Sequence, residues 1–187
     1  MSGRAGRIRI IGGQWARRQL PVIDAPGLRP TADRMRETLF NWLQFELPGA
    51  RVLDLFAGTG ALGLEALSRG AGEAVFVERN PKAARQLKTN LKMLGAAARV
   101  VQGDALRYLD GAPEAFDVVF VDPPFAEALQ ERVVQRLAQG WVAPGGWVYV
   151  EQPKKQPSPE VPESWRLHRE KTAGEVRYLL YQAGEDA

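Results

Sequence analysis

The residues best suited to chemistry are Asp122, Pro123, Pro124 and Phe125, which follow the apolar run 116–121. Proline has a fixed φ and no N–H group, so this turn offers carbonyl oxygens without competing donors. A planar base could stack on Phe125 while its exocyclic amine donates hydrogen bonds to Asp122 and to a backbone carbonyl. Such acceptors would help the amine attack an electrophilic methyl group. The alternative is a proline-rich turn with Phe125 as a core residue, and these four residues alone do not decide between the two.

A glycine-rich turn after the apolar run 51–56 is a second candidate site. Gly58 and Gly60 would let the backbone approach a ligand at the carboxyl end of a strand. With Gly63 they also match the dinucleotide fingerprint, so NAD stays open on this pattern. Asp54 favours S-adenosylmethionine, because a carboxylate inside the strand would repel a pyrophosphate and attract the cationic amino-acid end of the sulfonium cofactor.

Two more acids follow at the ends of the next apolar runs. Glu78 is placed to accept hydrogen bonds from both ribose hydroxyls of a nucleoside cofactor, which would serve NAD and S-adenosylmethionine alike. Asp104 could accept from the adenine amino group. The alternatives are an exposed strand-end acid for Glu78 and a helix N-cap for Asp104, and Asp104 could fill both roles.

Composition excludes several classes of protein. The 187 residues include no cysteine, which rules out disulfides, thiolate zinc sites and the cysteine adduct used in pyrimidine C5 methylation. The single histidine, His168, argues against a histidine-based metal site. No apolar run reaches the roughly 18 residues of a membrane span, and the N-terminus does not resemble a secretory signal. We therefore expect a cytoplasmic protein without a metal.

Positive charge is concentrated at the N-terminus. Residues 1–40 contain eight arginines and three acids, whereas the whole chain has a net charge of only +3. A basic arm on a slightly acidic body is typical of a nucleic-acid-binding protein, and arginine binds phosphate through two parallel hydrogen bonds. The alternative is a solvated basic face. The arginines predicted to bind RNA are Arg7, Arg9, Arg17, Arg18, Arg34 and Arg36.

Hydrophobic patterning predicts an α/β protein with a doubly wound, mostly parallel sheet. The expected strands are 51–56, 74–78, 98–102, 116–121 and 146–151. They alternate with helices expected at 60–69, 81–94, 104–109 and 126–138. Additional elements are an N-terminal hairpin turning at Gly12-Gly13 with its second strand from Gln14 to Leu20, a helix from Thr31 to about Glu46, and a closing hairpin of 165–171 and 175–181. We expect residues 1–46 to form a basic extension and residues 47–187 the catalytic domain.

The motifs D-L-F-A-G-T-G, V-E-R-N, G-D-A and D-P-P-F, in this order, resemble those of class I S-adenosylmethionine-dependent methyltransferases. Four further stretches are more specific: R-I-I-G-G-Q-W from Arg9, G-L-R-P-T-A-D-R from Gly27, R-E-T-L-F-N-W-L from Arg36 and A-L-G-L-E-A-L-S-R from Ala61. They closely resemble the bacterial RsmD family. The resemblance covers nearly the whole chain.

This resemblance implies a Rossmann-like methyltransferase that transfers a methyl group to the N2 amine of one guanine, guanine 966, of 16S ribosomal RNA. The resemblance further implies a substrate presented in the assembling small ribosomal subunit. We expect the protein to be a monomer. The implied base contacts are Asp122, Pro123, Pro124 and Phe125. The implied cofactor contacts are Asp54, Gly58, Gly60, Glu78 and Asp104. We also predict cofactor contacts at the neighbouring residues Phe56, Arg79 and Ala105. Competing hypotheses are a DNA amino-methyltransferase, a non-catalytic RNA-binding ribosome-assembly factor and an NAD oxidoreductase.

Overall fold

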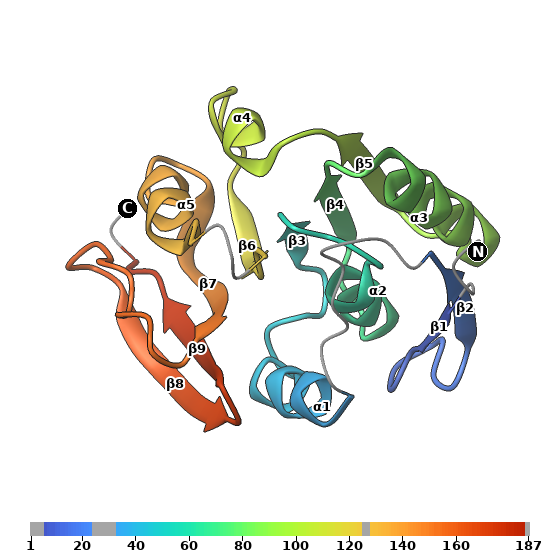
Figure 1. Cartoon of the computed structure of the whole chain (residues 1–187), viewed down its shortest axis with the longest axis horizontal. Coiled ribbons are helices and arrows are strands. Elements are labelled where there is room, and N and C mark those ends of the chain that lie inside the picture. The colour runs from blue at the N-terminus through green and yellow to red at the C-terminus, as the bar shows by residue number, and fades with distance from the viewer. Residues whose placement is uncertain (1–5, 24–32, 125–127, 186–187) are drawn as a thin grey trace.

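A seven-stranded sheet forms the centre of the molecule, with helices on both faces (Figure 1). The computed structural model describes residues 6–23, 33–124 and 128–185. Across the sheet the strand order is β5-β4-β3-β6-β7-β9-β8. Its strands are β3 (Arg51–Asp54), β4 (Glu73–Glu78), β5 (Ala98–Gln102), β6 (Phe116–Val121), β7 (Val142–Pro153), β8 (Arg166–Ala173) and β9 (Val176–Gln182).

The first five of these strands are parallel, and β9 and β8 join them as an antiparallel hairpin. The helices that connect or flank them are α1 (Asp33–Trp42), α2 (Ala61–Ser68), α3 (Pro81–Leu94), α4 (Ala105–Leu109) and α5 (Gln130–Leu137). This arrangement confirms the predicted doubly wound sheet and its C-terminal hairpin. Within the described ranges, no helix is long and apolar enough to span a membrane.

Side chains of the sheet alternate between two apolar cores. In β6, Val118 and Phe120 belong to the core under α1, α2 and α3, whereas Val119 and Val121 belong to the core under α4 and α5. Because successive side chains of a strand point to opposite faces, a strand covered on both faces reads as a continuous apolar run. This is why the parallel strands were recognisable in the sequence.

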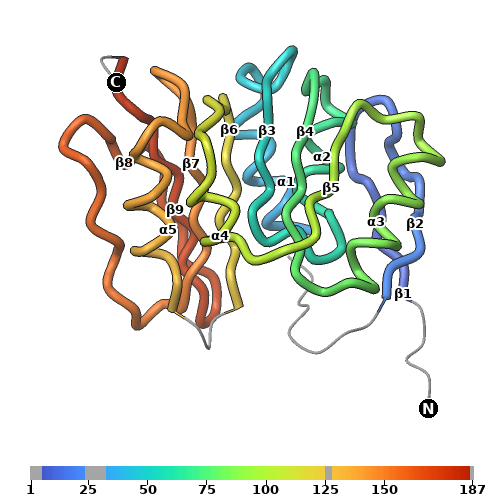
Figure 2. The backbone as a smooth tube through the Cα atoms, turned by 90° about the horizontal axis from the view of Figure 1, so that it is seen from above, coloured from blue at the N-terminus to red at the C-terminus, as the bar shows by residue number. Residues whose placement is uncertain are grey.

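The N-terminal hairpin, β1 (Gly6–Arg9) and β2 (Gln19–Val22), packs beside α2 and α3. Its apolar residues Ile8 and Leu20 lie in the same core as Leu64 of α2 and Leu87 of α3. The apolar core is therefore continuous between the N-terminal extension and the body. The N-terminal and C-terminal hairpins lie at opposite ends of the molecule (Figure 2).

The loop of the N-terminal hairpin is longer than the sequence suggested. The second strand begins at Gln19 and not at Gln14, because residues 10–18 form a loop that docks on the end of α2. In this loop Gln14 N–H donates to the carbonyl oxygen of Ser68 over 2.8 Å. Gly13 has a φ of +78°, and a Cβ there would lie 1.9 Å from the same carbonyl oxygen. The turn at Gly12-Gly13 thus serves docking rather than strand reversal.

Other element boundaries shift by a few residues. Helix α1 ends at Trp42, and turns rather than a helix occupy residues 43–46. The cap predicted at Thr31 and the expected helical residues 126–127 lie outside the described residues. Strand β7 begins at Val142, four residues before the prediction, with an irregular register opposite Phe116 and Val118.

Candidate active site

The sheet brings three of the predicted acids to one edge. Asp54 pairs with Phe76 of β4 on one side and with Phe120 of β6 on the other. Glu78 and Asp122 each follow these partners by two residues, so both lie two residues beyond Asp54 toward the carboxyl ends of the strands. The alternation of side chains places all three acids on the face that carries α1, α2 and α3. The predicted cofactor and base residues therefore meet at the carboxyl edge of the sheet, where open α/β sheets bind ligands.

Glu78 links the glycine-rich turn to the start of α3 by hydrogen bonds. Its carboxylate accepts hydrogen bonds from Gly58 N–H over 2.9 Å and from Asn80 N–H over 2.7 Å. Asn80 in turn caps α3 by accepting from the backbone N–H groups of Lys82 and Ala83. Glu78 is only 8% exposed, so the alternative of an exposed strand-end acid is wrong. The carboxylate sets the position of the turn that a cofactor would contact.

Asp54 is a buried acid next to that turn. It is 2% exposed and accepts a hydrogen bond from Gly63 N–H over 3.1 Å. Burial raises the pKa of Asp54 to about 7, opposed by the Gly63 hydrogen bond and reinforced by the charge of Glu78. A carboxyl group that is costly to ionise within the protein is stabilised by a bound cation.

Two glycines allow close packing at the start of α2, Gly60 against α3 and Gly63 against the sheet. Gly60 has a φ of +83°, and a Cβ there would lie 2.5 Å from the Leu87 side chain of α3. A Cβ on Gly63 would lie 2.3 Å from the ring of Phe76. Gly63 thus has the helix–strand packing role of the third glycine in the dinucleotide fingerprint. This packing is common to both cofactor hypotheses and does not separate them.

The remaining predicted cofactor residues lie in the segments that follow β3, β4 and β5. Asp104 caps α4 by accepting from Arg107 N–H over 3.1 Å, which confirms the N-cap alternative, while the adenine contact stays a prediction. Ala105 is buried as the first residue of α4, and Phe56 packs against the core on the α4 and α5 face. Arg79 is exposed between β4 and α3.

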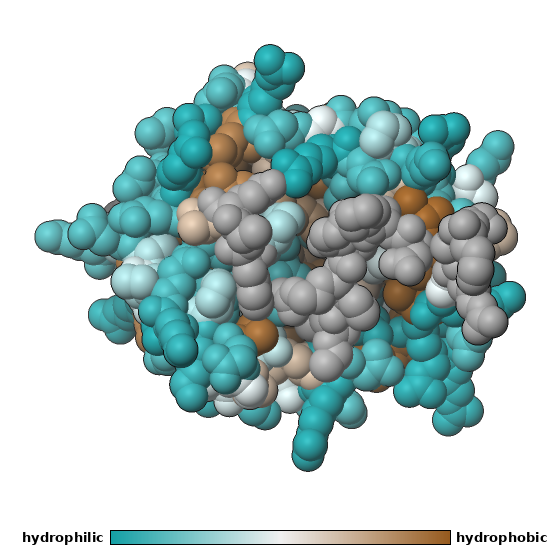
Figure 3. Space-filling view, viewed as in Figure 1, coloured by the Kyte–Doolittle hydropathy of each residue, from teal (hydrophilic) through white to brown (hydrophobic). Residues whose placement is uncertain are grey.

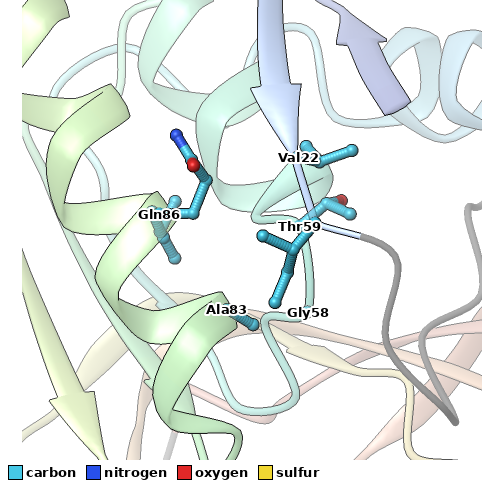
Figure 4. Close-up of a pocket in the computed structure, with 7 residues that line it drawn as sticks. Val22, Gly58, Thr59, Ala83 and Gln86 are labelled. Atoms are coloured by element: carbon cyan, nitrogen blue, oxygen red, sulfur yellow. The ribbon is translucent and has the colours of Figure 1, made fainter. Parts of the chain in front are cut away.

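A small pocket opens on the α3 side of the glycine-rich turn (Figure 4). Gln86 and Ala83 reach it from α3, Val22 from the end of β2, and Gly58 and Thr59 from the turn itself. The turn is therefore bordered on this side by the N-terminal hairpin, which connects the predicted RNA-binding extension with the predicted cofactor site.

The predicted catalytic turn continues directly from β6. Asp122 and Pro124 are partly buried, and Pro123 is buried. The stacking ring predicted at Phe125 lies outside the described residues. A buried pair beside this turn was not anticipated from the sequence: the Tyr149 hydroxyl donates to Glu151 Oε2 over 3.0 Å. A glutamate inside an otherwise apolar strand was the signal that could have revealed it.

Five of the six predicted RNA-binding arginines are exposed to solvent: Arg7, Arg9, Arg17, Arg18 and Arg34. Arg36 is the exception, being 3% exposed. Its guanidinium donates to Asp33 over 2.6 Å and lies 3.6 Å from Glu65. The structure therefore corrects the prediction for Arg36, because a buried and paired guanidinium is not available to phosphate.

Glu65 of α2 holds the hairpin loop in place, a role that was not anticipated from the sequence. Its fully buried carboxylate accepts from Ile11 N–H over 2.9 Å and from Gly12 N–H over 2.8 Å. Arg69 Nε also donates to it over 2.8 Å. Ser68 adds two hydrogen bonds, donating to the Gly12 carbonyl and accepting from Trp15 N–H. The loop between β1 and β2 is thus attached to the helix that follows the glycine-rich turn.

The raised pKa of Asp54 makes stability depend on pH. Between pH 3.8 and about 7 the folded state holds this proton more tightly than the unfolded state, so stability should fall as the pH rises through that window. Asp54→Asn keeps an acceptor for Gly63 N–H and removes the titration. We expect the free energy of unfolding of the wild type to lose roughly 2–3 kcal/mol more than that of the variant between pH 5 and pH 8. Urea unfolding at both pH values measures this difference, and parallel losses in the two proteins would contradict it.

The fold defines a Rossmann-like α/β protein, and its candidate ligand site is the acid-lined edge at the carboxyl ends of the strands. Among known proteins, SMU.776, solved in complex with SAH, shares this fold with a TM-score of 0.68 over 88% of this chain and 53% of that chain, at 13% identity. The structure of yhhF from Escherichia coli is more similar, with a TM-score of 0.88, 50% identity and coverage of 96% of this chain and 99% of that chain.

The family model "Conserved hypothetical protein 95" matches residues 8–182. Ribosomal RNA small subunit methyltransferase D of Escherichia coli strain K12 is 52% identical over 180 residues, which cover 95% of this chain and 91% of the relative. The chain therefore belongs to this family, which is the RsmD family that its motifs resemble.

Proposed function

We propose that this protein transfers a methyl group from S-adenosylmethionine to the exocyclic N2 amine of one guanine of 16S ribosomal RNA in the assembling small ribosomal subunit. The observation that carries the proposal is the meeting of Asp54, Glu78 and Asp122 at one edge of the sheet. The 52% identity to a ribosomal RNA small subunit methyltransferase supports the reaction class and the RNA. The choice of guanine N2 rests on the family resemblance.

The residues at this edge fit S-adenosylmethionine. Asp54 is buried with a raised pKa, so it would gain from a cationic amino-acid group beside it. The two oxygens of Glu78 each accept one backbone hydrogen bond, and a carboxylate can accept more, so ribose hydroxyls can be accommodated. When bound, the cofactor supplies an electrophilic methyl group. SMU.776, which shares the fold, was solved with SAH.

The turn after β6 would bind the target base. Asp122 accepts a hydrogen bond from the N2 amine, and the Pro123 carbonyl accepts a second. These acceptors orient the lone pair of the amine, so the contribution of the turn is mainly positioning. The guanine must leave its stack first, which costs a few kcal/mol and least in a loop. Phe125 would provide a stacking surface worth roughly 1–3 kcal/mol.

The exposed arginines of the N-terminal hairpin would bind the RNA backbone. Hydrophilic residues predominate along the edges of the face seen in Figure 3, with hydrophobic residues exposed between them. Replacing Arg7, Arg17 and Arg18 with glutamine should reduce the slope of log affinity against log salt by about 0.7 for each phosphate that the variant no longer neutralises. Filter binding to 16S ribosomal RNA over a salt series measures the slope.

Arg99→Gln is the matched control for these substitutions. Arg99 lies on β5, is 57% exposed and is paired with Glu114, so its replacement should leave the slope unchanged. Equal slopes for the wild type and the triple variant would remove the hairpin from the RNA interface.

The reaction itself is tested by mapping the transferred label. Small subunits lacking the modification are incubated with the protein and S-adenosylmethionine carrying a tritiated methyl group, and the labelled nucleoside is identified by digestion. We expect N2-methylguanosine at a single position. Label on DNA, on another base atom, or absent despite measurable cofactor binding would overturn the proposal.

A further inference from the structure

Strand β7 places another carboxylate in the same row as Asp122. Val121 of β6 pairs with Val150 of β7, so the following residues, Asp122 and Glu151, are neighbours across the two strands. Glu151 shares a face with Tyr149 and therefore with the acids of the proposed site. Parallel neighbouring strands are about 5 Å apart. Glu151 thus lies beside the proposed base-binding acid.

The carboxylate of Glu151 is held in a fixed place. Glu151 is fully buried and accepts a hydrogen bond from the Tyr149 hydroxyl over 3.0 Å. The Tyr149 ring is itself buried between Phe120, at a centroid distance of 6.2 Å, and Tyr178, at 6.5 Å. The backbone carbonyl of Glu151 accepts from the side chain of Gln130 over 3.1 Å. Because Gln130 begins α5, Glu151 joins the elements on both sides of the catalytic turn.

The pKa of the Tyr149 hydroxyl depends on the negative charges around it. Burial raises its pKa well above the ordinary value, and the charges of Glu151 and Asp122 raise it further. Both carboxylates therefore act on the same point in the protein. A charge excluded from water interacts more strongly with its surroundings than one in solvent.

We propose that Glu151 is a positioning residue that provides a second negative charge behind Asp122 and thereby stabilises the positive charge formed on the accepting amine. This inference rests on the proposed function. During transfer the amine nitrogen forms a bond to the methyl carbon with its lone pair, and the bond between that carbon and sulfur breaks with its electrons left on sulfur. Positive charge moves from sulfur to nitrogen, which then releases a proton to Asp122 and on to solvent.

Distance separates this role from cofactor binding. Strand β7 is adjacent to β6, but it is two strands away from β3, which is about 10 Å. The charge of Glu151 therefore acts mainly on the amine and only weakly on groups bound at Asp54 and Glu78. A fixed charge or dipole aimed at charge that develops during a reaction typically contributes about 100-fold or more in rate.

Two substitutions separate charge from shape. Glu151→Gln keeps the size and an acceptor for the Tyr149 hydroxyl but removes the charge, whereas Glu151→Asp keeps the charge and shortens the side chain. We expect the single-turnover rate on small subunits to fall about 100-fold for Glu151→Gln and less than about 10-fold for Glu151→Asp. The reverse order, with the glutamine variant faster, would show that only shape matters and would overturn the inference.

Binding and stability provide readouts that do not depend on activity. Calorimetry should give dissociation constants for S-adenosylmethionine and SAH that change less than about threefold in Glu151→Gln. Its Tm should not fall, because an amide is cheaper to bury than a carboxylate. A lower Tm together with weaker binding of both ligands would indicate a structural role only and would also overturn the inference.

Gln152→Leu is the control for disruption at the end of β7. Gln152 is equally buried but lies on the opposite face, where its amide donates to the carbonyls of Gln156 and Pro157. We expect a lower Tm with a rate within about threefold of the wild type. The Asp122→Asn variant distinguishes failure of the proposed site from failure of the role of Glu151. If both Asp122→Asn and Glu151→Gln leave the single-turnover rate unchanged, the proposed site itself is wrong. If Asp122→Asn lowers the rate and Glu151→Gln does not, only the role of Glu151 is wrong.

Discussion

Replacing Asp122 with alanine is expected to lower kcat by about 100- to 1,000-fold while the dissociation constant for S-adenosylmethionine changes less than about threefold. Asp122 lies at the end of β6, next to β3, but the backbone and acids that would hold the cofactor are those of the turns after β3 and β4. The substitution should therefore remove an acceptor of the target amine and leave the cofactor site intact. Single-turnover kinetics and calorimetry measure the two quantities independently.

Asp122→Asn is the informative companion variant. It retains one acceptor oxygen and removes the negative charge, so its rate should lie between those of the wild type and Asp122→Ala. Comparable losses of catalysis and cofactor affinity in the alanine variant would assign Asp122 to the cofactor site instead of the base site.

The second large effect concerns Glu65. Glu65→Ala should reduce the free energy of unfolding by about 3–5 kcal/mol, because it leaves the buried Arg36 guanidinium with Asp33 alone and the N–H groups of Ile11 and Gly12 without their acceptor. Urea unfolding followed by circular dichroism measures this decrease. The control is Glu73→Ala on β4, where Glu73 pairs with Arg51 at the surface.

An exposed ion pair of this kind contributes about 0–1 kcal/mol, so Glu73→Ala should be nearly neutral. Equal destabilisation by the two variants would mean that the attachment of the hairpin loop to α2 contributes little to stability.

The parallel strands were predictable because burial on both faces selects uninterrupted apolar runs, such as Phe116 to Val121. Motif order then located Asp54, Glu78 and Asp122 at the carboxyl edge, since parallel strands all end on the same side of the sheet. Contacts between segments that are distant in the sequence could not be predicted from local hydrophobic patterns. The sequence of residues 10–18 is compatible with a tight hairpin turn and the start of a strand. The structure shows a loop there instead, because its backbone forms hydrogen bonds to α2, which is distant in the sequence.

Arg36 illustrates the same difficulty for charges. In the sequence it is one of eight N-terminal arginines, and nothing in its immediate neighbourhood distinguishes it from Arg34. Besides Asp33 in the same helix, its partner is Glu65, which is 29 residues away on another helix. The position of Glu151 beside Asp122 could not be predicted for a related reason, because it depends on the pairing of β7 with β6.

The docking of residues 10–18 on α2 has a consequence for protein engineering. An RNA-recognition segment that is appended through a linker can be exchanged between enzymes without harm to the catalytic unit. Here the exchange of this segment alone would leave Glu65 and Ser68 facing foreign backbone. A chimaera that fuses another protein's targeting hairpin to this catalytic body should fold only if α2 is transplanted with it.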